Sequence, residues 1–406
     1  MRPIASMRDE SAPIIRETRH FGCYPTVFAC ATGGSVYLAR VTQHSEDNLA
    51  IFDPHRCDLE WEVRIALAAV QFFGAFPQHS DALQVLGRTD PEGQFVLFSG
   101  SDFIQYLAAT GWGDQWSNAS NVQYVLTRLS QESILADMGP ARGLTPYLRN
   151  TYITMHRVSA GQARGYLWLT PIFGSRFLIP AFGSITVPIE VIDDLGDHHM
   201  GTGLLLDEQT VLTCAHVLDG IKMENINLLD PVERAPMREL AASKGEMRVT
   251  EFKSHEEEDV AIIRFDRPAS AADPLPGLVF RDPTRADKVT LLGFPSVPYA
   301  RSAPLIAQSG EVSSTPLIVQ HGESASGPVI ALDGATVFLF SAVARPGNSG
   351  GAIVSSDGRV VGMVFRELKA DTDRPMGLPF YAGLPASSVV AAVKSLGFDG
   401  TLEFED

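Results

Sequence analysis

With 406 residues, the chain is too long for one ordinary domain and suits two, each able to bury its own core. Its formal net charge of −16 argues against a nucleic-acid partner, because phosphate binding requires clustered Lys and Arg. There is no apolar run long enough to cross a bilayer and no signal-peptide pattern at the start, so we expect a cytoplasmic protein without membrane contact.

The first part of the chain, residues 1–184, is predicted to form a mixed α+β domain. Apolar side chains at helical spacing predict a helix over 59–73. A second helix is predicted to begin at Ser120, a suitable N-cap, and to extend to about Met138. Short strands are expected at 26–30, 35–42, 49–52, 166–170 and 176–180.

The composition changes near residue 185. Residues 1–185 contain 14 Arg, no Lys, 16 acidic residues and all four Trp, for a net charge of −2, so the remainder carries −14. This shift supports a domain boundary there. No motif before it identifies a chemistry, and we expect the first domain to be a regulatory, sensor or partner-binding unit.

Residues 185–406 are predicted to form an all-β domain, because many short strands are separated by Gly, Pro and Asp. One helix is expected near the end, from Ser387 to Leu396, with Gly397 after it. The predicted strands are 185–192, 203–206, 210–213, 248–252, 261–265, 289–293, 310–313, 336–340 and 359–365.

A glycine-rich turn at 345–351, with the sequence RPGNSGG, lies between two apolar runs and contains Ser349. Glycines let the backbone turn tightly and leave its N–H groups open to a substrate oxygen, which a serine nucleophile requires. Taken alone, the same pattern is also compatible with a simple hairpin loop.

Two further stretches favour the catalytic interpretation of Ser349. An apolar hairpin at 201–213 leads into Cys214-Ala215-His216, which predicts a histidine held at the end of a buried strand, where a general base can be positioned. An acidic run at 256–258 ends on Asp259, which opens an apolar strand. Most histidines are surface or packing residues, and only its setting distinguishes His216 from the others.

In the order His216, Asp259, Ser349, these motifs resemble the chymotrypsin-like serine proteases over residues 185–400. Asn348 before the serine and the segment 380–385 are most similar to the Deg/HtrA branch. The resemblance implies two six-stranded barrels, with His216 and Asp259 on the first and Ser349 on the second. It further implies that Gly347 and Ser349 supply the oxyanion-hole N–H groups.

The sequence also departs from this family. Asn348 stands where the trypsin branch has an aspartate, so it cannot pair with a newly cut amino terminus, and no PDZ domain is evident after the protease. The residues that by resemblance line the substrate pocket are Val343, Gly362, Met363 and Val364. Because none of them is acidic, we expect cleavage after small or medium apolar residues.

We therefore expect a serine endopeptidase that acts on proteins or peptides without a metal or cofactor. We also expect that a ligand or partner bound to the first domain activates it. The four cysteines show no zinc-binding spacing. Two alternatives remain at this stage. One is an inactive trypsin-like scaffold, and the other is a sensor whose first domain carries the main function.

Overall fold

The computed structural model describes residues 59–74, 78–89, 96–111, 119–141, 148–155, 167–228, 248–266, 277–297, 304–314, 316–318, 336–368 and 380–405. The strands expected at 26–30, 35–42 and 49–52 lie outside these ranges. None of the described helices combines the length and apolarity needed to span a membrane.

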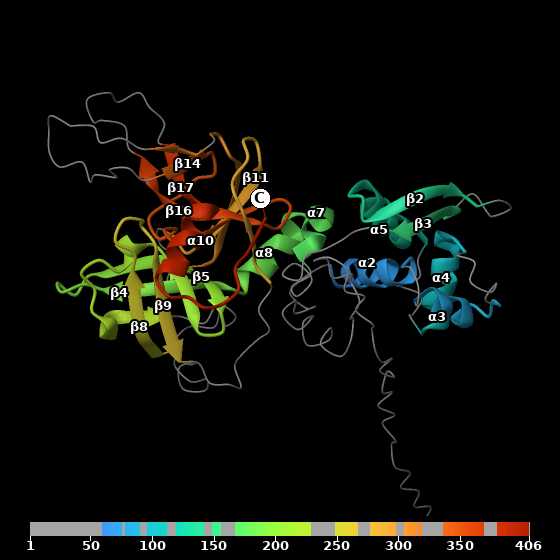
Figure 1. Cartoon of the computed structure of the whole chain (residues 1–406), viewed down its shortest axis with the longest axis horizontal. Coiled ribbons are helices and arrows are strands. Elements are labelled where there is room, and N and C mark those ends of the chain that lie inside the picture. Colours follow the sequence, from blue (N-terminus) through green and yellow to red (C-terminus); the bar gives the residue numbers. More distant parts are fainter. Residues whose placement is uncertain are drawn as a thin grey trace, which may run out of the picture.

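Helices and a small sheet form the first lobe, on the right in Figure 1. An antiparallel sheet of order β1-β3-β2 contributes Phe98 and Tyr152 to a core of aromatic side chains that includes Phe72, Phe73 and Phe103. This supports the expected mixture of helices and strands. The elements are α2 (Glu60–Phe72), α3 (Gln78–Val85), β1 (Phe98–Ser99), α4 (Gly100–Ala109), α5 (Ala119–Gln131), β2 (Leu135–Pro140) and β3 (Asn150–Thr154).

Helix α2 agrees with the predicted helix over 59–73, but α5 is shorter than predicted. It ends at Gln131, whereas the sequence pattern suggested about Met138. Ser133 has a positive φ of 58°, which an α-helix does not accommodate, and Leu135 then pairs with Thr154 in the sheet. The apolar residues after Ser133 therefore belong to a strand.

The segments predicted as strands at 166–170 and 176–180 are helical over their described residues, 167–170 and 176–180. They lie in η1 (Leu167–Leu169), α7 (Thr170–Phe173) and α8 (Ser175–Gly183), and Gly174 separates α7 from α8. Short apolar runs do not distinguish a strand from a buried helix, and here burial of Trp168, Phe177 and Phe182 decides the outcome. In Figure 1 these helices lie between the two lobes, and α8 contacts β11.

The second lobe begins with a sheet of six antiparallel strands in the order β7-β4-β5-β6-β9-β8. Edge strands β7 and β8 contact each other, so the sheet curls into a barrel-like form. Five of these strands lie where the sequence analysis predicted them, although β5 begins earlier, at His198, and β7 was not predicted. The strands are β4 (Thr186–Ile192), β5 (His198–Asp207), β6 (Thr210–Thr213), β7 (Ile226–Leu228), β8 (Arg248–Ser254) and β9 (Ala261–Asp266).

Nine described strands, and not the expected six, form the other sheet, whose main path is β12-β11-β15-β16-β17-β14-β13. Off this path, β10 pairs in parallel with both β16 and β18. Helix α10 (Ala386–Ser395) confirms the predicted final helix. The strands are β10 (Val279–Arg281), β11 (Lys288–Gly293), β12 (Ile306–Glu311), β13 (Leu317–Ile318), β14 (Thr336–Phe340), β15 (Ala352–Ser355), β16 (Val360–Leu368), β17 (Phe380–Pro385) and β18 (Glu403–Glu405).

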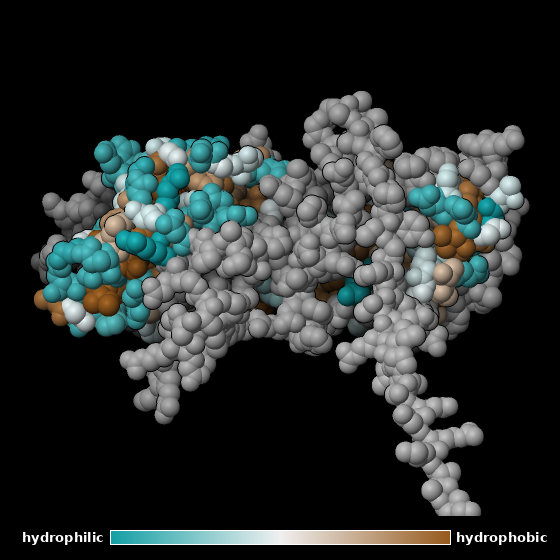
Figure 2. Space-filling model, turned by 90° about the horizontal axis from the view of Figure 1, so that it is seen from below, coloured by the Kyte–Doolittle hydropathy of each residue, from teal (hydrophilic) through white to brown (hydrophobic). Residues whose placement is uncertain are grey.

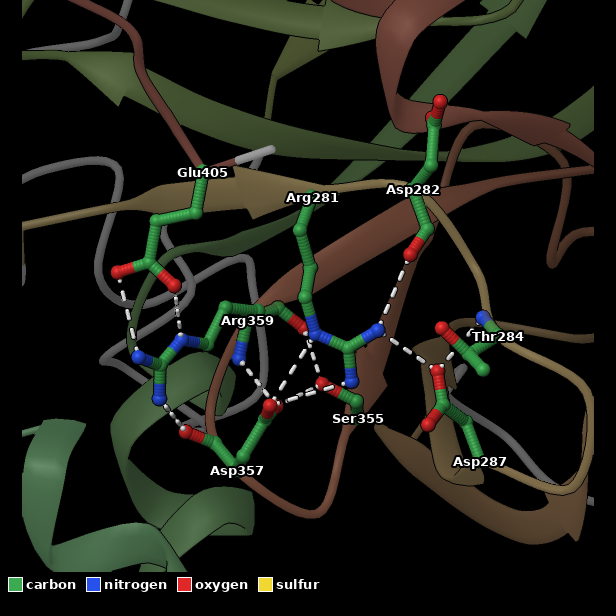
Figure 3. A network of polar contacts seen from close by, with 8 residues as sticks. All are labelled: Arg281, Asp282, Thr284, Asp287, Ser355, Asp357, Arg359 and Glu405. Atoms are coloured by element: carbon green, nitrogen blue, oxygen red, sulfur yellow. Dashed lines mark hydrogen bonds and ion pairs between the residues drawn. The ribbon is translucent and has the colours of Figure 1, made fainter.

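A polar network fastens the turn between β15 and β16 to β10 and β18 (Figure 3). Arg281 donates to Asp357 over 3.1 Å, and Arg359 makes two hydrogen bonds of 2.9 and 3.2 Å to Glu405. Burial raises the pKa of the Asp357 carboxyl, but the hydrogen bond from Ser355 and the charges of the two arginines outweigh it, and the pKa lies below its ordinary value. The turn is therefore held on two sides.

The described surface of the sheet lobe is mostly hydrophilic on the face shown in Figure 2, with hydrophobic residues interspersed in small areas. Leu195, in the turn between β4 and β5, is the most exposed large hydrophobic residue of the described part, at 87%. Apolar side chains scattered in this way are normal on a protein surface.

Candidate active site

His216 lies just beyond the end of a buried strand, as expected. Strand β6 is completely buried between β5 and β9, and the chain passes from it through Cys214 into the short helix η2 (Ala215–Val217). The Cys214 side chain is buried, and its thiol donates to the carbonyl of Val364 at 3.3 Å. Because its flanking backbone is anchored, His216 sits on a rigid base while its own side chain stays 31% exposed.

Asp259 reaches His216 because of the register between β6 and β9. Thr213 pairs with Ala261 in this antiparallel ladder, so His216 and Asp259 both lie just past the same end of it. Asp259 Oδ2 is 2.6 Å from His216 Nδ1, and Oδ1 accepts the backbone N–H of His216 at 2.8 Å. The carboxylate therefore orients the ring and the backbone of the histidine together.

Glu258, the last residue of the acidic run at 256–258, is half-buried beside Asp259. Burial raises the pKa of its carboxyl; the neighbouring His255 opposes this change, and Glu257 adds to it. The environment thus disfavours a second full negative charge next to Asp259.

Ser349 is the second residue of the second of two consecutive tight turns, 345–348 and 348–351, in the loop before β15. The Asn348 N–H donates to the Arg345 carbonyl and the Gly351 N–H to the Asn348 carbonyl, each at 2.9 Å. The third residue of each turn is a glycine with positive φ, +100° at Gly347 and +85° at Gly350. Pro346 before Gly347 completes the type II pattern in the first turn.

Steric contacts also require glycine at both positions. A Cβ on Gly347 would lie 2.5 Å from the Phe294 carbonyl oxygen, and a Cβ on Gly350 would lie 2.1 Å from the Thr202 carbonyl oxygen. Within the described part of the chain, neither the Gly347 N–H nor the Ser349 N–H donates to a carbonyl or a side chain. Two N–H groups on either side of Asn348 thus remain available.

The structure adds Phe365, which the sequence analysis did not single out. Among the described residues, the Ser349 hydroxyl donates only to the Phe365 carbonyl, at 3.3 Å. The Phe365 ring meets the His216 ring edge-on, with centroids 6.4 Å apart and an interplanar angle of 76°. Phe365 therefore contacts both His216 and Ser349. Its position at the end of the apolar run 360–365 was the only signal in the sequence.

Backbone hydrogen bonds hold the serine loop, residues 345–351, from both sheets. The Thr202 N–H of β5, in the first sheet, donates to the Ser349 carbonyl at 2.9 Å, and the Gly350 N–H donates to the Val364 carbonyl of β16, in the second sheet, at the same distance. Asn348 is 1% exposed, and neither polar atom of its amide has a partner in the described ranges. Its burial is consistent with a packing role for this residue in the loop.

The predicted pocket residues have different environments. Val343 is 36% exposed, whereas Met363 and Val364 are each 1% exposed. Gly362 pairs with Ile353 and Pro385 inside the sheet, and a Cβ there would lie 2.3 Å from the Leu384 carbonyl oxygen. Of the four, Val343 alone presents a substantial side-chain surface.

The described residues contain one group of side chains with the chemistry of metal ligands, formed by Cys214, His216 and Asp259. Their ligand atoms all lie within 4.8 Å of one another. The 2.6 Å hydrogen bond between His216 and Asp259 already uses one atom of each. This arrangement orients an imidazole for proton transfer.

Comparison with known proteins identifies the second lobe. Residues 201–363 match the family of trypsin-like peptidase domains, while a search of curated proteins gives no significant match. Among solved structures, the active form of the Rv3671c protease from M. tuberculosis is 22% identical over 55% of this chain and 86% of its own, with a TM-score of 0.40. An HtrA-type protease with a tripeptide is 17% identical over 55% of this chain and 64% of its own, with a TM-score of 0.38. The match to the family of trypsin-like peptidase domains thus covers the part of the chain that contains His216, Asp259 and Ser349.

Proposed function

We propose that the protein is a serine endopeptidase with His216, Asp259 and Ser349 as its catalytic triad. The observation that carries the proposal is the double contact of Asp259 with His216, 2.6 Å to Nδ1 and 2.8 Å to the backbone N–H. This contact places the imidazole proton on Nδ1 and leaves Nε2 free to accept a proton. The family match of residues 201–363 supports peptidase chemistry.

In this mechanism the Ser349 hydroxyl turns from the Phe365 carbonyl to His216. Its proton passes to Nε2 as Oγ bonds to the carbonyl carbon of the scissile peptide. The resulting oxyanion accepts hydrogen bonds from the Gly347 and Ser349 N–H groups, each donor contributing about 3 kcal/mol to transition-state stabilisation. His216 then protonates the leaving amine, and water hydrolyses the acyl-enzyme by the same proton route.

Labelling with a fluorophosphonate probe tests this proposal. Such a probe reacts only with a serine whose proton is accepted by a neighbouring base, so the unmodified protein is expected to label. The label should disappear in Ser349→Ala and weaken strongly in His216→Ala. Ser356, in the turn after β15, provides the control, and Ser356→Ala should label normally. An unmodified protein that is folded but takes no label would point to an inactive scaffold.

The proposed cleavage preference is for small or medium apolar residues on the amino-terminal side of the cut bond. It rests on Val343, the exposed residue of the predicted pocket base, which offers no carboxylate to an Arg or Lys side chain. A peptide library should show preference for Val, Ala or Leu. Val343→Asp is expected to shift this preference toward Arg and Lys. Dominant cleavage after Arg or Lys by the unmodified protein would contradict the assignment.

Regulation by the first domain is the third part of the proposal, and contacts through α7 support it. Arg128 of α5 donates to the Ile172 carbonyl over 2.7 and 3.1 Å and to the Pro171 carbonyl over 3.3 Å. On its other side, this segment touches the β15–β16 turn, because a Cβ on Gly358 would lie only 2.8 Å from Thr170 Oγ1. Helix α7 therefore contacts α5 on one side and, on the other, the β15–β16 hairpin that directly follows the serine loop in the chain.

We infer a resting state in which the triad is incompletely engaged, because the Ser349 hydroxyl is bonded to the Phe365 carbonyl. A ligand or partner on the first domain would then favour the engaged state. A difference of a few kcal/mol holds resting activity to about one per cent.

Weakening the α5–α7 contact tests this regulation in the full chain. Arg128→Ala is expected to raise the hydrolysis rate of a small peptide by about tenfold, since hydrogen bonds from a charged group contribute about 1.5–3 kcal/mol. The exposed Arg149 supplies the matched control, and Arg149→Ala should leave the rate unchanged. Equal rates for the unmodified protein, Arg128→Ala and Arg149→Ala would contradict this regulation. They would favour a first domain that docks substrates without controlling the rate.

A further inference from the structure

Thr202 makes more contacts to the serine loop than its place in the other sheet would require. It lies in the middle of β5 and is completely buried. Its hydroxyl donates to the Gly347 carbonyl at 2.6 Å and accepts the Phe294 N–H at 3.0 Å. Its backbone N–H donates to the Ser349 carbonyl at 2.9 Å. One residue of the first sheet therefore holds the carbonyls of Gly347 and Ser349 in the second.

The hydroxyl acts on the turn that presents the Gly347 N–H. Type I and type II turns differ by rotation of the central peptide, here between Pro346 and Gly347, and only the type II form has positive φ at the third residue. The Pro346 carbonyl accepts the Ser296 N–H at 3.4 Å, a long and weak bond. The bond from Thr202 is shorter, and it holds the carbonyl of Gly347, on the other side of the Gly347 Cα from the central peptide. It therefore fixes the position of Gly347, while the bond from Ser296 acts on the central peptide itself.

We propose that Thr202 is a positioning residue for the oxyanion hole, because its hydroxyl holds the Gly347 carbonyl and thereby fixes Gly347 within the 345–348 turn. This inference rests on the proposed peptidase function. Without the hydroxyl, Gly347 can shift and its N–H can move away from the developing oxyanion. The ground-state substrate depends less on that N–H than the transition state does, so the loss falls on kcat.

The test compares Thr202→Val, which keeps the shape but removes the hydroxyl, with Thr202→Ser, which keeps the hydroxyl. Thr202→Val is expected to lower kcat by about ten- to a hundredfold with KM within about threefold, less than the about 10²–10³-fold effect of deleting an oxyanion donor outright. The affinity for a peptide aldehyde, which forms a tetrahedral adduct, should fall by the same factor. Thr202→Ser should recover most of both.

Thr186 provides the matched control for the loss of a buried hydroxyl. It is also completely buried in the first sheet, and its hydroxyl donates to the Phe182 carbonyl at 2.7 Å, far along the chain from the serine loop. Thr186→Val should lower the melting temperature about as much as Thr202→Val does, but it should leave kcat and the affinity for the peptide aldehyde unchanged.

The outcomes separate this inference from the proposed function. If the unmodified protein turns over peptides and Thr202→Val keeps its kcat within twofold, the positioning role is wrong while the peptidase function stands. If the unmodified protein neither reacts with the fluorophosphonate probe nor hydrolyses peptides, the peptidase function and the positioning role are both wrong. Should Thr202→Val not fold, Thr202→Cys keeps a weaker donor at the same place. An intermediate kcat then supports the role, and an unchanged kcat contradicts it.

Discussion

Replacing Ser349 by alanine is expected to lower kcat for peptide hydrolysis by about 10⁶-fold, because the acyl-enzyme route is lost together with its nucleophile. The two turns around Ser349 depend on Gly347 and Gly350, and β5 holds the Ser349 backbone. Alanine fits the same backbone, so the N–H groups of the loop stay in place. KM should therefore change little.

The double variant Ser349→Ala/His216→Ala sharpens this prediction. Members of a triad act as a unit, so the double variant should be no slower than Ser349→Ala alone. Single-turnover kinetics of the unmodified protein, the two single variants and the double variant, with thermal unfolding to confirm that each is folded, would measure the effect. Multiplication of the two single effects, or a Ser349→Ala protein that keeps more than about one thousandth of the rate, would contradict a shared triad.

Replacing Asp259 by asparagine is expected to lower kcat by about 10⁴-fold while leaving the fold intact. Oδ1 of Asp259 accepts the His216 backbone N–H, and an asparagine oxygen can keep this bond. Its amide NH₂ then faces Nδ1, which must become an acceptor. The ring proton moves to Nε2, and His216 can no longer take the proton of Ser349.

The exposed Asp266 at the end of β9 gives a matched control for this change. Asp266→Asn removes the same charge at the other end of β9, the strand that Asp259 precedes, and should keep kcat within about twofold. Asp259→Asn should also lose most of its fluorophosphonate labelling. If Asp259→Asn and Asp266→Asn were equally active, Asp259 would have a structural role only.

Local patterns in the sequence were sufficient for several features. The spacing of apolar residues predicted α2 correctly, because this helix buries one face against a core. The boundary residues at 387–397 predicted α10, which ends just before Gly397. The alternation of short β-rich runs and turn residues located several strands of both sheets but not β7, β10, β13, β15, β17 or β18. The order of the motifs suggested the trypsin-like family, which the match of residues 201–363 supports. These signals depend on residues close together in the chain.

Only the tertiary structure decided the features that depend on distant partners. The segment 167–183 is helical because it buries its large side chains between two lobes, and β18 joins the second sheet by pairing with β10. The contacts of Phe365 with His216 and Ser349, and of Thr202 with Gly347, join residues that are far apart in sequence. No local pattern encodes such pairs, because strand order and the packing of the two sheets determine which side chains meet.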